Sequence, residues 1–313
     1  MIERTLDIGR LVLENGESLE AVKQHATIYG DQVTADKIVL VTHALSGNSR
    51  AADWWAPLIG PGRLFDPQHD CVICINTLGS CYGSSGPDDV RPFPTITVGD
   101  MVNAQARALH RLGINYIDIV IGGSLGGMQA LQWALAYPRR VGTAIVIGAY
   151  DHFSAQGIAL NALGREAIRN DPRDGLSLAR KIAMLSYKSD ELLEERHSNR
   201  IDRNGGSKYD VEGYLDYQGA QFASRMSAQS YVCLTKAMDA FDVRGYPIER
   251  TDPRLIFVGI SSDWLFRPER VYEASLRMQA RGFDARYVEL TSRDGHDAFL
   301  SNGALIAGEL LAI

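Results

Sequence analysis

The chain has 313 residues, 45% hydrophobic and 22% charged, which suits one large globular domain with an insertion. Its formal net charge of −6 and the lack of a dense Lys/Arg run argue against nucleic-acid and anionic-membrane partners. No segment is long and apolar enough for a transmembrane helix, and the charged N-terminus lacks the pattern of a secretory leader. We therefore expect a cytoplasmic protein that does not bind membranes.

The first half of the chain is predicted to alternate strands and helices. Residues 1–36 have the pattern of antiparallel strands joined by turns. Apolar and helical periodicities then predict, in chain order, strands at 37–45 and 69–79, a helix at 98–113, a strand at 116–124, a helix at 124–138 and a strand at 139–150. Buried strands that alternate with helices are typical of a mostly parallel sheet with helices on both faces.

The alternation stops near residue 150 and resumes near residue 254. Residues 151–250 show only helical patterns, with a loop predicted at Asn204-Gly205-Gly206. The final part predicts a strand at 254–262, a helix at 267–282, a strand at 285–290 and a C-terminal helix from about residue 296. We therefore predict one catalytic domain, formed by 1–150 and 251–313, with a helical lid inserted at 151–250.

Cys71 and Cys74 have a C-x-x-C spacing that could indicate a metal or redox site. They lie in a predicted strand, where side chains three residues apart point to opposite faces. No second pair of ligands accompanies them, so we expect two core residues. The sequence predicts no metal site and no tightly bound cofactor.

Residues 122–126, Gly-Gly-Ser-Leu-Gly, match the G-x-S-x-G pattern between a predicted strand and a predicted helix. In that context a sharp turn exposes the serine at the end of the sheet and at the start of the helix. Ser124 is therefore the predicted nucleophile, and the backbone N–H of Leu125 a predicted oxyanion donor. A glycine-rich turn that only packs helix on strand is the alternative, which the flanking elements disfavour. Together these features predict an α/β-hydrolase fold.

A serine nucleophile needs a base and an acid, which follow it in the order Ser, Asp, His in this fold. Asp263 and His296 each follow a predicted strand, so both should lie at the same sheet edge as Ser124. His296 would move the serine proton, and Asp263 would orient the imidazole. The second oxyanion donor is expected in the loop after the first parallel strand, at the backbone N–H of Leu45, with His43 shaping that loop.

The sequence resembles the homoserine O-acetyltransferases of the α/β-hydrolase superfamily. The resemblance implies ping-pong transfer of an acetyl group from acetyl-CoA, as co-substrate, through Ser124 to the hydroxyl of L-homoserine, in methionine biosynthesis. It also implies a homodimer formed through the lid. The segments that carry it are GGSLGGMQALQWALAYP (122–138), THALSGN (42–48), NTLGSCYGSSGP (76–87), FPTITVGDMVNAQ (93–105), SAQGIALNALGREAI (154–168), ARKIAMLSYKSDE (179–191), YQGAQFASRMSAQSYVCLTKAMDAFD (217–242), VGISSDWLFRPE (258–269) and GHDAFL (295–300).

The same resemblance implies an amino-acid site formed by Arg180, Tyr187 and Asp297. Arg180 would clamp the α-carboxylate of the substrate, and Asp297 would pair with its α-ammonium group. The structural alternative is that Arg180 and Tyr187 lie two turns apart on one helix face and only pack the lid.

The chain departs from the family pattern at two shortened segments, 88–92 and 171–175. The sequence leaves several chemistries open. Succinyl-CoA or L-serine could replace acetyl-CoA or L-homoserine in the same reaction type. Water could replace the amino acid, which would make the protein an esterase or thioesterase. A non-catalytic binding module is disfavoured by the intact Ser124, Asp263 and His296.

Overall fold

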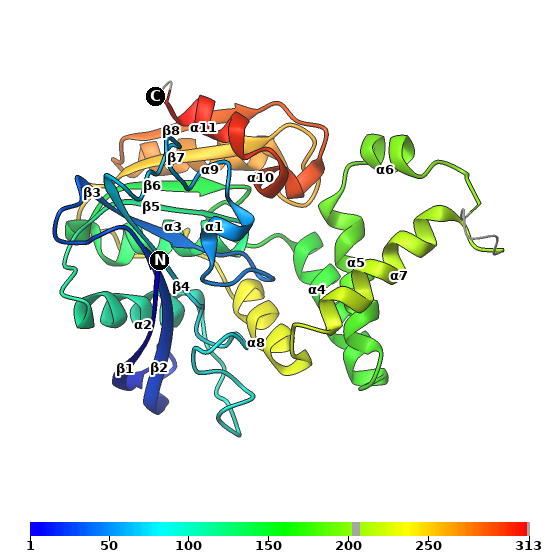
Figure 1. Ribbon diagram of the computed structural model, residues 1–313, viewed down its shortest axis with the longest axis horizontal. Coiled ribbons are helices and arrows are strands. Elements are labelled where there is room, and N and C mark those ends of the chain that lie inside the picture. The colour runs from blue at the N-terminus through cyan, green and yellow to red at the C-terminus, as the bar shows by residue number, and fades with distance from the viewer. Residues whose placement is uncertain (202–206, 312–313) are drawn as a thin grey trace.

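The computed structural model describes residues 1–201 and 207–311, so the loop predicted at 204–206 lies outside the described residues. Its centre is an eight-stranded sheet in the order β1-β2-β4-β3-β5-β6-β7-β8 (Figure 1). The strands are β1 Ile2–Val12, β2 Ser18–Tyr29, β3 Lys37–Thr42, β4 Asp70–Ile75, β5 Ile117–Gly123, β6 Val141–Ile147, β7 Arg254–Ile260 and β8 Ala285–Leu290. This confirms the predicted α/β-hydrolase fold.

The sheet is antiparallel at one edge and parallel across the rest. β1 pairs antiparallel with β2, and β2 pairs antiparallel with β4. Strands β4, β3, β5, β6, β7 and β8 are all parallel to their neighbours. The carboxyl ends of β3, β5, β6, β7 and β8 therefore meet at one edge, which is where ligands bind in sheets of this kind.

Helices cover both faces of the sheet, as predicted. On one face lie α2 Val98–Arg111, α3 Leu125–Ala136 and α9 Pro268–Ala280, which bury Met128 and Val271. The other face is covered by α1 Ala51–Trp54, α10 Ala298–Ser301 and α11 Gly303–Leu311, with Phe299 and Ile306 packed inward. The C-terminal helix predicted as one element is divided, because it begins with the single 3-10 turn η2 Gly295–Asp297 and breaks at Asn302.

The two cysteines confirm the predicted orientation along β4. Cys71 is buried in the core on the α2–α3 side of the sheet, and Cys74 is buried in the core on the opposite side. Both are free thiols. Burial raises the pKa of both thiols, that of Cys71 to about 11, so neither is a ready nucleophile.

The described part of the segment between β6 and β7 holds five helices: α4 Ala155–Asn170, α5 Gly175–Tyr187, α6 Asp190–Arg196, α7 Asp210–Ala223 and α8 Ala228–Asp239. Figure 1 shows them gathered to one side of the sheet, with α8 nearest to it. The helical pattern of this segment is interrupted after α5, because Ser189 caps a new helix by accepting from the Leu192 N–H at 3.1 Å. No helix in the described part of the chain is both long and apolar enough to cross a membrane.

Candidate active site

Ser124 occupies a strained turn between β5 and α3. Its backbone has φ 58° and ψ −124°, a left-handed conformation that is rare for a residue with a side chain. The turn needs its glycines, since a Cβ at Gly122 would lie 2.3 Å from the Thr42 hydroxyl and one at Gly126 would lie 2.0 Å from the Thr42 carbonyl oxygen. The structure therefore places Ser124 at the carboxyl end of a central strand and at the first turn of a helix.

His296 and Asp263 form a buried pair at the same sheet edge. His296 Nδ1 lies 2.6 Å from Asp263 Oδ2, and both side chains are buried. The other carboxylate oxygen, Oδ1, accepts the backbone N–H groups of Leu265 at 2.9 Å and Phe266 at 2.8 Å. With both oxygens of Asp263 engaged, the proton on His296 is held at Nδ1, and Nε2 is left as the acceptor.

The Nε2 atom of His296 is buried and has no hydrogen-bond partner among the described residues. The His296 imidazole and Ser124 lie close to the same neighbouring residues. Ser124 donates its N–H to the Ile147 carbonyl at 2.9 Å, and a Cβ on the next residue, Gly148, would lie 3.2 Å from His296 Cε1. Tyr187 lines the cavity at Ser124, and its ring centroid lies 5.7 Å from that of His296. The three predicted catalytic residues are thus brought together.

The predicted oxyanion donors lie in two backbone segments on either side of Ser124. Leu45 belongs to a turn closed by the Gly47 N–H, which donates to the Ala44 carbonyl at 2.9 Å. Among the described residues, no acceptor is found for the Leu45 N–H. Leu125 is the first residue of α3, where helix geometry leaves the N–H without an intrahelical partner. Both groups are therefore available to a ligand oxygen.

Two buried side chains hold these segments. His43 Nδ1 lies 2.8 Å from the Ala44 carbonyl, and its Nε2 accepts the Thr77 N–H at 2.9 Å, which assigns the proton to Nδ1. Gln129 Nε2 lies 3.3 Å from both the His43 carbonyl and the Leu125 carbonyl, so one amide joins the two segments. His43 thus lies in the loop where the sequence placed it, whereas Gln129 was not predicted; its only signal was its place in the Gly-Gly-Met-Gln run after the serine.

The buried His43 is expected to make the fold sensitive to acid. Burial lowers the pKa of His43 from 6.5 to about 4, so the unfolded chain binds more protons than the folded one between these values. Stability from this residue is complete above pH 6.5 and is lost as the pH falls toward 4. We expect the free energy of unfolding to drop by about 2 kcal/mol more in the parent protein than in His43→Gln between pH 7 and pH 4.5.

Urea unfolding at the two pH values measures this difference. Carboxylates and the other histidines contribute equally to both proteins, so subtraction isolates His43. His110→Gln, at an exposed position, is the matched control and should lose as much stability as the parent. Equal losses in the parent and His43→Gln would show that His43 is not held neutral by burial.

Arg180 and Tyr187 lie together on α5, as their spacing predicted. The guanidinium carbon of Arg180 is 5.2 Å from the Tyr187 ring centroid and 4.9 Å from that of Phe222. Arg180 forms no ion pair in the described part of the chain, and its Nε is buried without a partner. Burial raises the pKa of Tyr187, which keeps the phenol a neutral hydrogen-bond donor. A cation without a counter-charge beside the catalytic cavity suits an anionic ligand.

Asp297 follows His296 in the η2 turn and is already paired. Its Oδ2 lies 2.8 Å from Lys188 Nζ, and both side chains are mostly buried. Lys188 was not predicted, because it directly follows Tyr187 in the chain but its charge alone gives no indication of a partner. Any ammonium group that binds Asp297 therefore shares the carboxylate with Lys188.

The cavity at Ser124 is small, about 20 Å³, which is room for about one water molecule. Its wall is largely apolar and includes Phe153, Leu160, Met238 and Leu265. A cavity of this size leaves little room for water beside Ser124.

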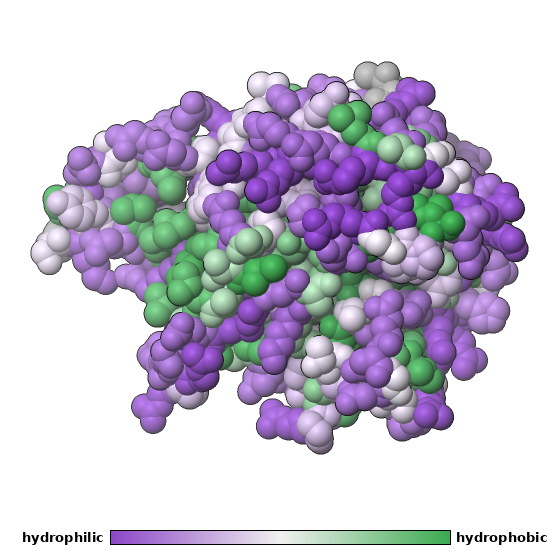
Figure 2. All heavy atoms as spheres, turned by 180° about the vertical axis from the view of Figure 1, so that it is seen from behind, coloured by the Kyte–Doolittle hydropathy of each residue, from purple (hydrophilic) through white to green (hydrophobic). Residues whose placement is uncertain are grey.

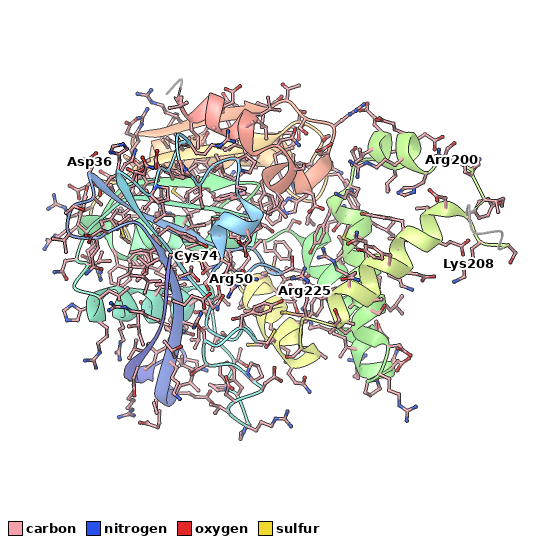
Figure 3. All side chains as sticks on the ribbon, viewed as in Figure 1. Asp36, Arg50, Cys74, Arg200, Lys208 and Arg225 are labelled. Atoms are coloured by element: carbon pink, nitrogen blue, oxygen red, sulfur yellow. The ribbon has the colours of Figure 1, made fainter. Side chains whose placement is uncertain are left out.

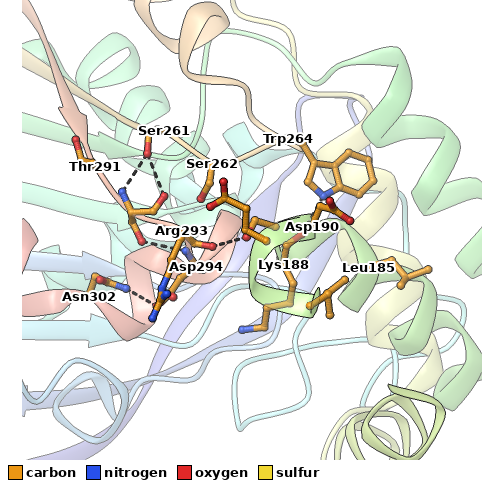
Figure 4. Close-up of a pocket in the computed structure, with 14 residues that line it drawn as sticks. Leu185, Lys188, Asp190, Ser261, Ser262, Trp264, Thr291, Arg293, Asp294 and Asn302 are labelled. Atoms are coloured by element: carbon orange, nitrogen blue, oxygen red, sulfur yellow. Dashed lines mark hydrogen bonds between the residues drawn. The ribbon is translucent and has the colours of Figure 1, made fainter. Parts of the chain in front are cut away.

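A larger cavity of about 1170 Å³ is lined in part by the loops that follow β7 and β8 (Figure 4). It is lined by Lys188, Trp264 and Asp294 among others, but by neither Ser124 nor His296. Many of its polar groups bond to one another: the Ser261 hydroxyl bonds the backbone of residue 292, and Asn302 donates to Asp294 at 2.6 Å. We therefore take the small cavity as the candidate site, because Ser124 and Tyr187 line it.

Comparisons with known proteins agree with this geometry. Residues 37–302 match the family model of the alpha/beta hydrolase fold. A homoserine O-acetyltransferase from Symbiobacterium thermophilum is 41% identical, across 95% of this chain and 89% of that protein. The crystal structure of a homoserine O-acetyltransferase from Staphylococcus aureus superimposes with a TM-score of 0.86 at 28% identity, covering 99% of this chain and 94% of that one.

An acetylester hydrolase from Corynebacterium glutamicum shares the fold alone, with a TM-score of 0.83 at 22% identity over 99% of this chain and 94% of that one. The sheet topology and the matching family model together define a protein of the α/β-hydrolase class. Within that class, the identity and coverage of its relatives show that the chain belongs to the homoserine O-acetyltransferase family. The resemblance inferred from the sequence motifs is therefore confirmed.

Proposed function

We propose that the protein transfers an acetyl group from acetyl-CoA to the hydroxyl of L-homoserine, by a ping-pong mechanism through Ser124. One observation carries the choice of an amino-acid acceptor. The Arg180 guanidinium, which has no ion pair within the described residues and whose Nε is buried without a partner there, lies against Tyr187, which itself lines the Ser124 cavity. An enzyme that used water as acceptor would need no such cation.

In the first half-reaction, His296 Nε2 takes the Ser124 proton while the serine oxygen attacks the thioester carbonyl. The N–H groups of Leu45 and Leu125 stabilise the negative charge that develops on the carbonyl oxygen. The carbon–sulfur bond then breaks, and His296 returns the proton to the departing thiolate. The products are free CoA and acetyl-Ser124.

In the second half-reaction, the acceptor hydroxyl gives its proton to His296 and attacks acetyl-Ser124. Collapse of the second tetrahedral intermediate breaks the Ser124 ester, and His296 returns the proton to the serine oxygen. The product, O-acetyl-L-homoserine, would feed methionine biosynthesis. Asp263 stabilises the imidazolium in both halves through its bond to Nδ1.

Arg180, Tyr187 and Asp297 would orient the acceptor. The guanidinium of Arg180 can bind the α-carboxylate with two parallel hydrogen bonds, and the Tyr187 hydroxyl can add a third. Lys188 contacts Oδ2 of Asp297, so Oδ1 is the expected partner of the α-ammonium group. The inserted segment 151–250 would act as the lid that keeps water from the acyl-enzyme.

A hydrolase with the same catalytic residues is the competing function, because the two activities differ only in the nucleophile that reaches acetyl-Ser124. A thiol-release assay on the purified protein separates them. Acetyl-CoA or succinyl-CoA is mixed with L-homoserine, L-serine or no acceptor. We expect rapid release of CoA only with acetyl-CoA and L-homoserine together. Equal release without any acceptor would assign the protein to the hydrolases.

We also propose a cytoplasmic homodimer formed through the inserted helices. All four cysteines are free thiols, including the partly exposed Cys81 and Cys233, which supports a reducing compartment. Leu163, Leu178 and Tyr217 keep 53%, 50% and 61% of their surface exposed, and Figure 2 shows hydrophobic residues gathered over the inserted helices at its left. Sedimentation equilibrium at several protein concentrations tests the assembly; a monomer throughout would contradict it.

A further inference from the structure

The turn that carries Leu45 is held from its solvent side by a residue of the inserted segment. Arg225 lies in the link between α7 and α8, and its Nη1 donates to the Ser46 carbonyl at 2.7 Å. Figure 3 shows Arg225 where α8 meets the body of the molecule, far from the outer tip of the insertion marked by Arg200 and Lys208. The contact joins the inserted helices directly to the oxyanion turn.

Arg225 is itself held in place by neighbours that do not compete for its charge. Its guanidinium carbon lies 5.5 Å from the Phe222 ring centroid, and Nη1 is 3.4 Å from the Tyr82 hydroxyl. Its backbone carbonyl lies 3.7 Å from the Cys81 thiol. The described residues offer Arg225 no carboxylate within ion-pair distance, so the Ser46 carbonyl is its closest acceptor.

The position of this hydrogen bond matters for Leu45. The peptide unit between Ser46 and Gly47 makes two contacts: its N–H closes the turn onto the Ala44 carbonyl at 2.9 Å, and its oxygen accepts from Arg225. The Ala44 carbonyl belongs to the peptide unit that carries the Leu45 N–H. Fixing the orientation of one end of the turn therefore fixes the direction of the donor at the other end.

The inner side of the turn has separate supports in His43 and Gln129. Loss of Arg225 should therefore leave the turn in place but less well ordered. This differs from the loss of a buried group, which would disturb the core. An exposed arginine that bonds a backbone carbonyl beside the catalytic site is suited to tune geometry without supporting the fold.

We propose that Arg225 is a positioning residue of the oxyanion hole, which makes acyl transfer depend on the docking of the α7–α8 link against the Ala44–Gly47 turn. The role rests on the proposed acyl-enzyme chemistry at Ser124. Arg225 does not touch the reacting atoms; it acts through the backbone of residues 45–47. Both half-reactions pass through an oxyanion, so both should depend on it equally.

The test compares Arg225→Ala with the parent protein on two donors, acetyl-CoA and p-nitrophenyl acetate, which has no nucleotide or pantetheine. We expect kcat to fall roughly 10-fold to 100-fold with both donors, less than the loss of a whole oxyanion donor. The KM values for acetyl-CoA and L-homoserine should stay within about 2-fold. Arg225→Lys, which keeps one charged donor, should recover part of the loss.

Arg169→Ala, at an exposed position on α4, is the matched control and should behave as the parent. Thermal unfolding of Arg225→Ala should match the parent, since the contact is exposed. A raised KM for acetyl-CoA with unchanged kcat would overturn the proposal and assign Arg225 to donor binding. Unchanged kcat with p-nitrophenyl acetate would overturn it as well. If the parent acylates from the ester but never transfers to L-homoserine, the proposed function fails while the role of Arg225 is still decided.

Discussion

Ser124→Ala is expected to lower kcat for acetyl transfer by about 10⁴-fold to 10⁶-fold, because no other group can form the acyl-enzyme. His296 and Asp263 would remain paired, but His296 Nε2 would have no serine hydroxyl from which to take a proton. Stability should hardly change, since alanine has the same backbone restriction as serine at φ 58° and the Ser124 hydroxyl forms no hydrogen bond within the described residues. The loss of activity would thus be chemical rather than structural.

Two measurements check this expectation. Steady-state CoA release gives the loss in rate, and intact-protein mass spectrometry after mixing with acetyl-CoA alone should show an acetyl adduct on the parent only. Ser198→Ala, at an exposed position near the end of α6, is the matched control and should be fully acetylated and active. Substantial turnover by Ser124→Ala would mean that another residue is the nucleophile.

Arg180→Met is expected to raise the KM for L-homoserine by about 10-fold to 100-fold, while acylation by acetyl-CoA stays close to the parent rate. The physical reason is the loss of a charge-assisted, two-point contact with the α-carboxylate, worth about 1.5–3 kcal/mol. Methionine retains an unbranched apolar stem, so packing against Tyr187 and Phe222 is largely kept. The substitution therefore tests the charge and not the packing.

Lys181→Ala is the control on the same helix. Lys181 pairs with Asp216 rather than with the catalytic cavity, so its loss should leave the KM for L-homoserine unchanged. Pre-steady-state acylation and steady-state transfer, measured side by side, separate the two halves of the reaction. An unchanged KM in Arg180→Met would favour the packing alternative and remove Arg180 from the acceptor site.

The positions of the three proposed catalytic residues could be predicted from the sequence, because each depends on a short local pattern. Ser124 follows a continuous apolar strand and precedes a helix, and Asp263 and His296 follow strands that reach the same edge. Parallel strands then bring these residues together without any knowledge of side-chain contacts. Cys71 and Cys74 could be assigned to opposite faces of the sheet for the same reason, since the alternation of side chains along a strand is a local property.

The unpredicted features all depend on contacts between distant segments. The pairing of Lys188 with Asp297 joins residues on two elements that sequence patterns cannot bring into register. Gln129 is a helical residue whose amide meets carbonyls from two segments, and nothing in its spacing indicates this. The break between α5 and α6 could not be predicted, because the apolar period continues through Ser189 and the cap that starts α6 is a single hydroxyl.

The proposed catalytic residues follow strands of the sheet, whereas Arg180 and Tyr187 come from the segment inserted between β6 and β7. Such a division lets a lineage change its acceptor by rewriting one stretch of sequence, with the machinery that forms the acyl intermediate left untouched. The sheet would then be retained between relatives, and the insertion would be the segment that changes when a different alcohol is acylated. The contact of Arg225 with the oxyanion turn marks the boundary that any such exchange would have to preserve.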